Sequence, residues 1–362
     1  MIKYDNMNHK FQIGQEYDHQ TGGLRDTFFI MRRWGNVLVE AAPRYGKSVL
    51  VKDLVVKISK KRKIIIFDYG KEWEDNLSKY NMWAPYPDRL VGYKVLDNFT
   101  FNIMSFNNDD DYASLGFTGF HASFICSVIR QSVDFHRGDL TLISEMLSRL
   151  PVKGGQHYSF NNNYGTNLDG PVNFSSKTKI VNWWAIIKRY FWQGKDDPRP
   201  IYDFAKELLE NDHLIIDFGI DDPVAGQWIA RAYAAKALEQ LKTVWADTHP
   251  VFVFEESRMF FPKWEGDVSL SSNNEAYNLV THGPKNGVMV IFIVQHKNQI
   301  YIPIMENIHI RLIGVVQNAK LVFPYDIRLK YDPERKIREF LYLDINCTPN
   351  DRHYSVFRPC IP

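Results

Sequence analysis

The sequence has few cysteines, no long apolar run and no excess of charge of either sign. Its three cysteines, Cys126, Cys347 and Cys360, are odd in number and lack metal-type spacing, which argues against a disulfide framework and favours a reducing, cytoplasmic compartment. The longest apolar run, VMVIFIV at 288–294, is far shorter than the ~20 residues of a transmembrane helix. The N-terminus, MIKYDNMNHK, lacks the apolar centre of a signal peptide. These features predict a protein without membrane insertion.

The charges nearly cancel, with 44 Lys and Arg against 42 Asp and Glu. No global electrostatic field therefore steers the chain toward nucleic acid or anionic lipid, although a local basic patch or ring remains allowed. The 362 residues, 45% of them hydrophobic, are enough to bury a substantial core in one large domain or two of ordinary size.

Short apolar runs alternate with helical patterns along most of the chain. Uninterrupted apolar strands separated by helices are typical of a sheet that is covered on both faces. We therefore expect an α/β fold with a mostly parallel central sheet flanked by helices. The predicted strands lie at 37–41, 63–68, 214–218, 251–255, 288–294 and 310–316.

The pattern divides the chain into a core and three additions. Residues 1–36 form an N-terminal extension that is too short for an independent domain, and 37–100 with 200–316 form the core. Residues 101–199 are predicted to be an insertion, because a single crossover needs far fewer residues. The insertion begins with helical patterns at 112–133 and 140–150, continues in a Gly-, Asn- and Ser-rich excursion at 152–179 and then has an aromatic helix at 180–192. Residues 317–362 are predicted to add antiparallel strands at a sheet edge, at 319–327, 339–345 and 353–359.

The octet AAPRYGKS, at 41–48, matches the P-loop spacing, with Ala41 in place of the first glycine. Backbone N–H groups and the following helix N-terminus form an anion site, Lys47 adds a charge for the β and γ phosphates, and Ser48 would ligate Mg²⁺. The alternative is a Gly-Lys turn that begins an ordinary helix. The predicted nucleotide-binding residues are Ala42, Pro43, Arg44, Tyr45, Gly46, Lys47, Ser48 and Val49.

Polar side chains follow the later strands of the predicted sheet. Glu255 and Glu256 end the run VFVFEE, and we predict that the first holds Mg²⁺ and the second activates the attacking water. Gln295 ends the next strand, where an amide can contact the γ phosphate and the water. Asp217, in LIIDFG, is an alternative candidate for the acidic site that a P-loop needs. Solvated acids and an ordinary loop glutamine are the alternatives when each motif is taken alone.

The order of AAPRYGKS, FDYGKEW, LIIDFG, VFVFEESRMFFP and VMVIFIVQH resembles the HerA/FtsK superfamily of P-loop ATPases over residues 37–316. The resemblance implies a P-loop NTPase (RecA-like) core with ATP as the nucleotide. It also implies a ring, expected to be a hexamer, with sites between subunits and double-stranded DNA in its channel. It also implies a position for Asp68 near the nucleotide and a structural role for Asp217.

Two features depart from this family. Many members have an Arg-Lys-x-Gly segment whose arginine reaches the neighbouring subunit's nucleotide, whereas this chain has GPKNG. The trans finger therefore stays open between Lys285, Arg258 and Arg311, and lysine is the poorer bidentate clamp. HerA itself has a small β-barrel before its core, and residues 1–36 are too few for us to expect that barrel in them.

We expect an ATP-hydrolysing motor that packages or transfers DNA for a virus or mobile element, with a capsid portal, nuclease or relaxase as partner. The alternatives are a secretion or pilus ATPase with protein cargo, a HerA-like DNA-processing translocase, and a nucleotide-binding module without hydrolysis. Lys153, Lys177 and Lys179 in the polar excursion are the candidate DNA contacts. The basic run KISKKRK, at 57–63, is interpreted as a solvated surface.

Overall fold

Eleven strands form one sheet, in the order β2-β1-β13-β12-β9-β3-β8-β7-β4-β6-β5. The structure is a computed structural model that describes residues 9–17, 24–31, 35–71, 73, 92–117, 120–136, 140–149, 174–263, 270–315, 329, 331–332, 337–344 and 354–359. Within these residues, no helix is both long and apolar enough to cross a bilayer.

The parallel part of the sheet runs from β9 to β5 and confirms the predicted α/β fold. Six of its strands are the predicted apolar runs, and the seventh, β5, was missed because it is a short edge strand whose first three residues are not buried. These strands are β3 (Val37–Glu40), β4 (Ile64–Asp68), β5 (Tyr93–Leu96), β6 (His213–Asp217), β7 (Val251–Phe254), β8 (Met289–Val294) and β9 (Ile310–Ile313).

Strands from both ends of the chain extend this sheet in antiparallel fashion. Two of the predicted C-terminal strands are confirmed, but the N-terminal hairpin pairs beyond them, so they do not form the outer edge. The third, predicted at 319–327, lies outside the described residues. These strands are β1 (His9–Tyr17), β2 (Leu24–Met31), β12 (Phe340–Asp344) and β13 (Tyr354–Pro359), with β10 (Tyr331–Asp332) and β11 (Ile337–Arg338) forming a separate pair.

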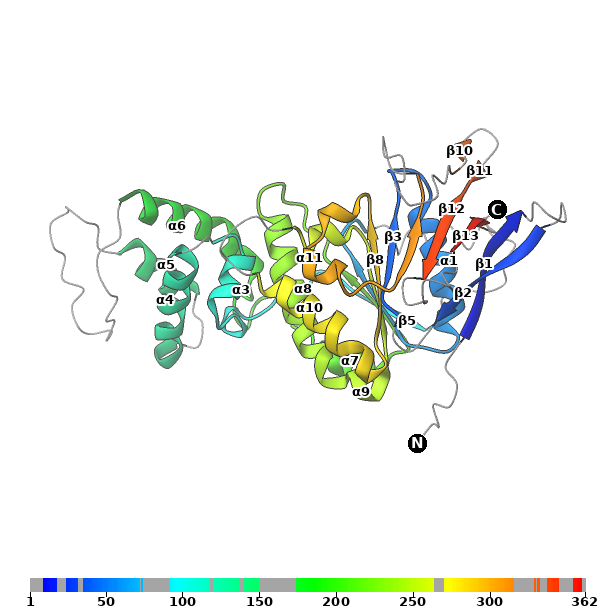
Figure 1. Cartoon of the computed structure of the whole chain (residues 1–362). Coiled ribbons are helices and arrows are strands. Elements are labelled where there is room, and N and C mark those ends of the chain that lie inside the picture. Colours follow the sequence, from blue (N-terminus) through cyan, green and yellow to red (C-terminus); the bar gives the residue numbers. More distant parts are fainter. Residues whose placement is uncertain are drawn as a thin grey trace.

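Helices cover both faces of the parallel strands (Figure 1). Successive side chains of a strand point to opposite faces, so Val37 and Val39 pack with α1 (Lys47–Ser59) while Leu38 belongs to the core under α8. The helices of that second face are α7 (Phe204–Glu210), α8 (Gly226–Leu241), α9 (Trp245–Thr248), α10 (Ser271–His282) and α11 (Ile302–Met305).

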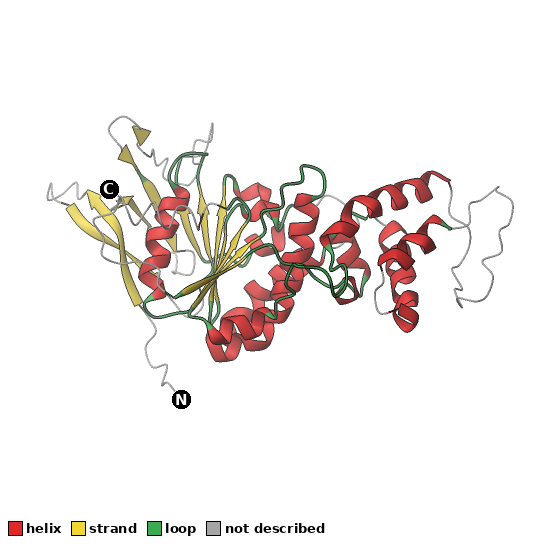
Figure 2. Ribbon diagram, turned by 180° about the vertical axis from the view of Figure 1, so that it is seen from behind, coloured by secondary structure: helices red, strands yellow, loops and turns green. Residues whose placement is uncertain are grey.

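Four helices between β5 and β6 extend away from the sheet, beyond α8 and α10 (Figures 1 and 2). A buried ion pair at 2.9 Å, between Lys236 of α8 and Asp111, joins them to the core. The predicted helical stretch at 112–133 is divided after Gly116, whose positive φ of 91° lets the chain leave the first helix. The four are α3 (Asp109–Ser114), α4 (Phe120–His136), α5 (Leu140–Ser148) and α6 (Phe174–Ile187).

The predicted excursion at 152–179 is wrong at its end, because residues 174–179 already belong to α6. Lys177 and Lys179 therefore lie on a helix, where apolar side chains such as Ile180 and Trp184 supply the buried contacts. Lys153 and residues 151–173 lie outside the described residues.

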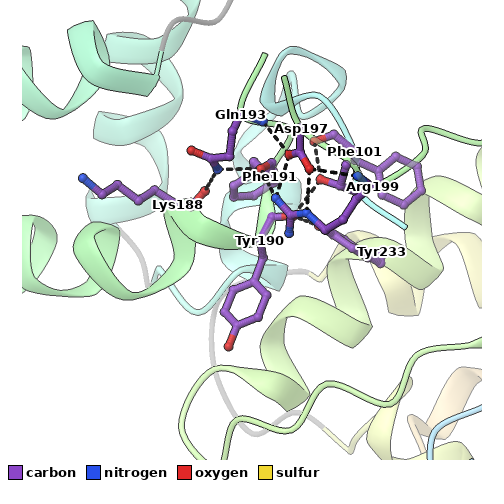
Figure 3. A network of polar contacts seen from close by, with 9 residues as sticks. Phe101, Lys188, Tyr190, Phe191, Gln193, Asp197, Arg199 and Tyr233 are labelled. Atoms are coloured by element: carbon purple, nitrogen blue, oxygen red, sulfur yellow. Dashed lines mark hydrogen bonds and ion pairs between the residues drawn. The ribbon is translucent and has the colours of Figure 1, made fainter. Parts of the chain in front are cut away.

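After α6 the chain returns to the core through a polar network (Figure 3). Arg199 donates to the Asp197 carboxylate at 2.8 and 3.0 Å and to the carbonyl oxygen of Phe191 at 2.9 Å. The Gln193 side chain donates to the carbonyl oxygens of Phe191 and Lys188. The side-chain donors pair these carbonyl groups, which favours a single conformation of the connection.

The amino ends of the parallel strands are joined by basic side chains. Arg62 donates to the carbonyl oxygens of His249, at 2.9 Å from its Nε, Pro250, at 3.2 Å, and Gly287. Lys63 donates to carbonyl groups at the end of α7, where the helix dipole favours a cation. Together they connect the residues that precede β4, β6, β7 and β8.

The interpretation of 57–63 as a solvated surface is therefore wrong for Arg62 and Lys63, which are half-buried. It holds for Lys60 and Lys61, which are exposed. The remaining short turns are 3₁₀ helices: η1 (Ile103–Ser105), η3 (Lys188–Tyr190), η4 (Lys242–Val244), η5 (Ser257–Met259), η6 (Gly283–Asn286) and η7 (Lys297–Gln299).

Candidate nucleotide site

The loop between β3 and α1 has the backbone geometry of an anion site. Gly46 has φ 98° and ψ 21°, a left-handed conformation that glycine adopts without strain, and Arg44 also has a positive φ of 63°. No side chain caps the N-terminus of α1, so its first N–H groups are available to an anion. Lys47 is buried, and its Nζ donates to the carbonyl oxygen of Ala42 at 3.1 Å, which holds the ammonium against the loop.

Tyr45 differs from the other residues of this loop because its side chain is buried against the C-terminal strands. Its hydroxyl donates to the carbonyl oxygen of Glu339 at 2.6 Å, and its ring packs edge-to-face on Phe340 at 5.1 Å between centroids. A Cβ at Gly314 would lie 2.5 Å from that ring. Only the backbone of Tyr45 is left to bind phosphate, and the side chain instead anchors the loop.

Glu255, which directly follows β7, meets the loop across the sheet. Ser48 Oγ donates to Glu255 Oε1 at 2.9 Å, and the indole Nε1 of Trp73 donates to Oε2 at 2.9 Å. The Glu255 residue is 4% exposed. The predicted pairing of these two motifs is therefore present, whereas Trp73 was missed; its only signal was an aromatic residue five positions after Asp68.

Glu256 has a different environment from its neighbour. Its side chain is 35% exposed, and Arg258 lies 3.3 Å away as an ion pair. Gln295 Nε2 donates to Glu256 Oε1 at 3.4 Å, which brings the predicted sensor and the second acid together. One acid is thus buried between two donors, and the other is partly exposed between an amide and an arginine. This arrangement suits a metal-linked role for Glu255 and a water-activating role for Glu256.

Two buried side chains hold these turns in place and were not predicted. Ser257 Oγ donates to the carbonyl oxygen of Phe254 at 2.9 Å and accepts from the Ile293 N–H at 2.9 Å, which connects the ends of β7 and β8. Glu40 Oε1 accepts from the Lys297 N–H at 2.8 Å. The segment that carries Gln295 is therefore tied to both neighbouring strands.

Asp68 and Asp217 end the neighbouring strands β4 and β6 and have different partners. Asp68 accepts from the N–H groups of Gly70 at 3.2 Å and Trp73 at 2.8 Å, so it shapes the turn after β4. Asp217 pairs with Lys71 at 3.6 Å and lines a separate pocket of about 320 Å³. Burial raises the pKa of Asp217. These contacts favour the structural role that the resemblance implied for Asp217.

The three candidate fingers lie in different surroundings. Lys285 is exposed in η6, at the amino end of β8 and so at the edge of the sheet opposite the P-loop. The Arg258 side chain is 42% exposed and pairs with Glu256 of its own chain. Arg311 is half-buried in β9, where burial lowers its pKa and Glu40 opposes that shift. The position of Arg311 disfavours a contact with another subunit.

The oxygen atoms of Ser48 and Glu255 fit Mg²⁺, because hydroxyl and carboxylate oxygens are its preferred protein ligands and here lie 2.9 Å apart. Such an ion would reduce the negative charge of bound phosphates. The same two residues are those that the sequence predicted as its ligands.

No family model matches the sequence, and no curated protein matches it either. Among solved structures, VirB4 of Thermoanaerobacter pseudethanolicus is 12% identical and has a TM-score of 0.60, with 98% of each chain covered. The plasmid coupling protein TrwB, in complex with the GTP analogue GDPNP, is 10% identical with a TM-score of 0.57, covering 90% of this chain and 86% of TrwB.

The chain therefore has the P-loop NTPase fold of VirB4 and TrwB. The genome-packaging NTPase B204 of Sulfolobus turreted icosahedral virus 2 has a TM-score of 0.40, at 10% identity over 92% of this chain and 100% of B204. Identities this low establish the fold, and the chemistry depends on the side chains of the site itself.

Proposed function

We propose that this chain is an ATP-hydrolysing ring motor that translocates DNA, as a genome-packaging or DNA-transfer ATPase of a virus or mobile element. The observation that carries the proposal is the 2.9 Å hydrogen bond from Ser48 of the P-loop to Glu255 after β7. It joins the two halves of a P-loop hydrolytic site, which lie 207 positions apart in the sequence.

We assign a group of this chain to each step of hydrolysis. The N–H groups at the start of α1 and the Lys47 ammonium bind the phosphates. Glu256 orients the attacking water and takes its proton, while Gln295 lies within hydrogen-bond distance of Glu256 and can contact the same water. A finger from the neighbouring subunit, Lys285 or Arg258, completes the site in a ring, which we expect to be a hexamer.

DNA contact is assigned to the projecting helices between β5 and β6. Lys179 is exposed on α6, and Lys177, two residues before it on a different side of the helix, is half-exposed. Each can contact a phosphate group from its own side of the helix. The likeness to a conjugative coupling protein supports a role in transfer. The proposal also includes a cytoplasmic location, the division of the chain near 36, 100, 199 and 316, and a portal, nuclease or relaxase partner.

The test is ATP turnover by the full chain, with and without double-stranded DNA, alongside a mass measurement of the assembled ring. We expect a ring whose turnover rises with DNA, and loss of turnover in Lys47→Ala. DNA-independent turnover would favour a protein cargo instead. Tight ATP binding without turnover in the ring would favour a nucleotide-binding module and end the motor proposal.

A further inference from the structure

The Glu255 carboxylate has a donor on each of its oxygens. Ser48 Oγ donates to Oε1 and Trp73 Nε1 donates to Oε2, both at 2.9 Å. A carboxylate with one donor can still rotate about its Cγ–Cδ bond, whereas donors on both oxygens fix the plane of the group. Trp73 is fully buried, so water does not compete for its indole N–H.

Trp73 is itself held by the strand next to β7. Its backbone N–H donates to Asp68 Oδ2 at 2.8 Å, and Asp68 ends β4, which pairs with β7 in parallel register. Asp68 is 1% exposed. A path of hydrogen bonds thus runs from the end of β4, through the backbone and indole of Trp73, to Glu255.

A buried cation lies over the indole ring. Lys52 is 3% exposed, and its Nζ lies 5.2 Å from the centroid of the Trp73 ring. Lys52 is four residues after Ser48 on α1, so both side chains lie on the same face of that helix. A cation over an indole draws electron density from the ring, which makes the N–H a stronger donor to a carboxylate.

We propose that Trp73 is a positioning residue that orients the Glu255 carboxylate for Mg²⁺, and that Lys52 strengthens its hydrogen bond. This inference rests on the proposed ATPase function. Trp73 acts on the metal through Glu255 and touches no phosphate, so its loss should weaken Mg²⁺ use and leave the binding of metal-free ATP unchanged. Loss of a residue that only filled the core would not weaken Mg²⁺ use while leaving the binding of metal-free ATP unchanged.

The experiment compares Trp73→Phe with Trp184→Phe in the full chain. Trp184 is also buried, and its Nε1 donates to Ser144 Oγ at 3.0 Å in the helices away from the site. Trp184→Phe therefore removes one indole hydrogen bond, as Trp73→Phe does, and is the matched control. We measure the Mg²⁺ concentration for half-maximal ATP turnover and the affinity for ATP in EDTA. Trp73→Phe should raise the Mg²⁺ requirement about tenfold, within the range for residues that support metal ligands. Trp184→Phe should change neither quantity.

A Trp73→Phe protein with the wild-type Mg²⁺ requirement would overturn the inference while leaving the proposed function intact. A wild-type chain that binds no ATP would instead refute the proposed function.

If Trp73→Phe unfolds below the assay temperature, Lys52→Met serves as the second variant. Lys52→Met should raise the Mg²⁺ concentration for half-maximal turnover less than tenfold, and an unchanged Mg²⁺ requirement would count against the inference. Indole N–H resonances give a readout without activity. Among the nine tryptophans, one resonance should move when Glu255→Gln removes the carboxylate charge, and none moving would refute the contact.

Discussion

The two edges of the parallel sheet use basic side chains in opposite ways. At the carboxyl edge, Lys47 lies in a loop whose helix N-terminus has no side-chain cap, next to acids that end β7. At the amino edge, Arg62 and Lys63 donate to carbonyl oxygens that precede three strands, β6, β7 and β8. The first edge keeps backbone donors available to a ligand, and the second has its donors and acceptors matched within the fold.

This difference explains why density of charge is a poor guide to function here. The run at 57–63 is the most basic in the sequence, yet its last two residues, Arg62 and Lys63, stabilise strand ends. The single Lys47 is the better candidate because open α/β sheets place their sites at the carboxyl ends of strands. Four experiments follow, ordered from the largest expected effect to the smallest. The first three test whether the two edges are as distinct as the contacts imply, and the fourth tests an ion pair away from both edges.

Glu256→Gln should lower kcat about 10²- to 10⁴-fold, the usual contribution of a general base, with ATP binding retained. The amide keeps the size of the side chain but cannot accept the proton of the attacking water. Steady-state turnover and ATP affinity are the measurements. Glu210→Gln, an exposed acid at the end of α7 near the amino edge, is the control and should be unchanged. Equal losses in the two variants would remove the distinction between the edges.

Lys47→Ala should lower kcat/KM about 10²- to 10³-fold, because one charged donor to the phosphates is removed. The melting temperature should change little, because the hydrogen bond from Lys47 Nζ to the carbonyl oxygen of Ala42 lies within one loop. ATP titration and thermal melting of the same samples check both statements. A variant that loses stability but retains ATP affinity would show that Lys47 acts as Arg62 does.

Arg62→Met should lower the free energy of unfolding by about 2 kcal/mol, because carbonyl groups before β7 and β8 lose a charged donor. ATP affinity of the folded variant should stay within about twofold, as the change lies at the far edge. Urea unfolding and ATP titration are the measurements. Lys61→Met, an exposed neighbour, should change stability by less than about 0.5 kcal/mol. A large loss of ATP affinity in Arg62→Met would couple the two edges.

Low pH should weaken the ion pair between Arg199 and Asp197 in the connection after α6. The Arg199 guanidinium holds the pKa of Asp197 well below its ordinary value of 3.8. The folded state therefore binds fewer protons than the unfolded state, so this stabilisation is complete above that value and is lost as pH falls below it. Melting temperatures between about pH 5 and pH 3 should fall less in Asp197→Asn than in the wild type. Parallel curves would contradict this assignment.

Much of the site was predictable because its motifs are local. Gly46, Lys47 and Ser48 are consecutive, and Glu255 and Glu256 directly follow an apolar strand. Trp73 could not be predicted as a partner of Glu255, because the two are 182 positions apart and only the pairing of β4 with β7 brings them together. The role of Tyr45 was also hidden, since its hydroxyl partner, the Glu339 carbonyl, is 294 positions away.

The sequence by itself determined the α/β fold, six of the seven parallel strands and the residues of the phosphate loop, because strand burial and helix starts are encoded over short distances. Only the tertiary structure decided the order of the strands, the position of β8 between β3 and β7, and the carbonyl partners of Arg62. These depend on contacts between distant segments, whose free energies no local pattern records. The same contacts place one acid of the pair between two donors and leave the other partly exposed beside Gln295.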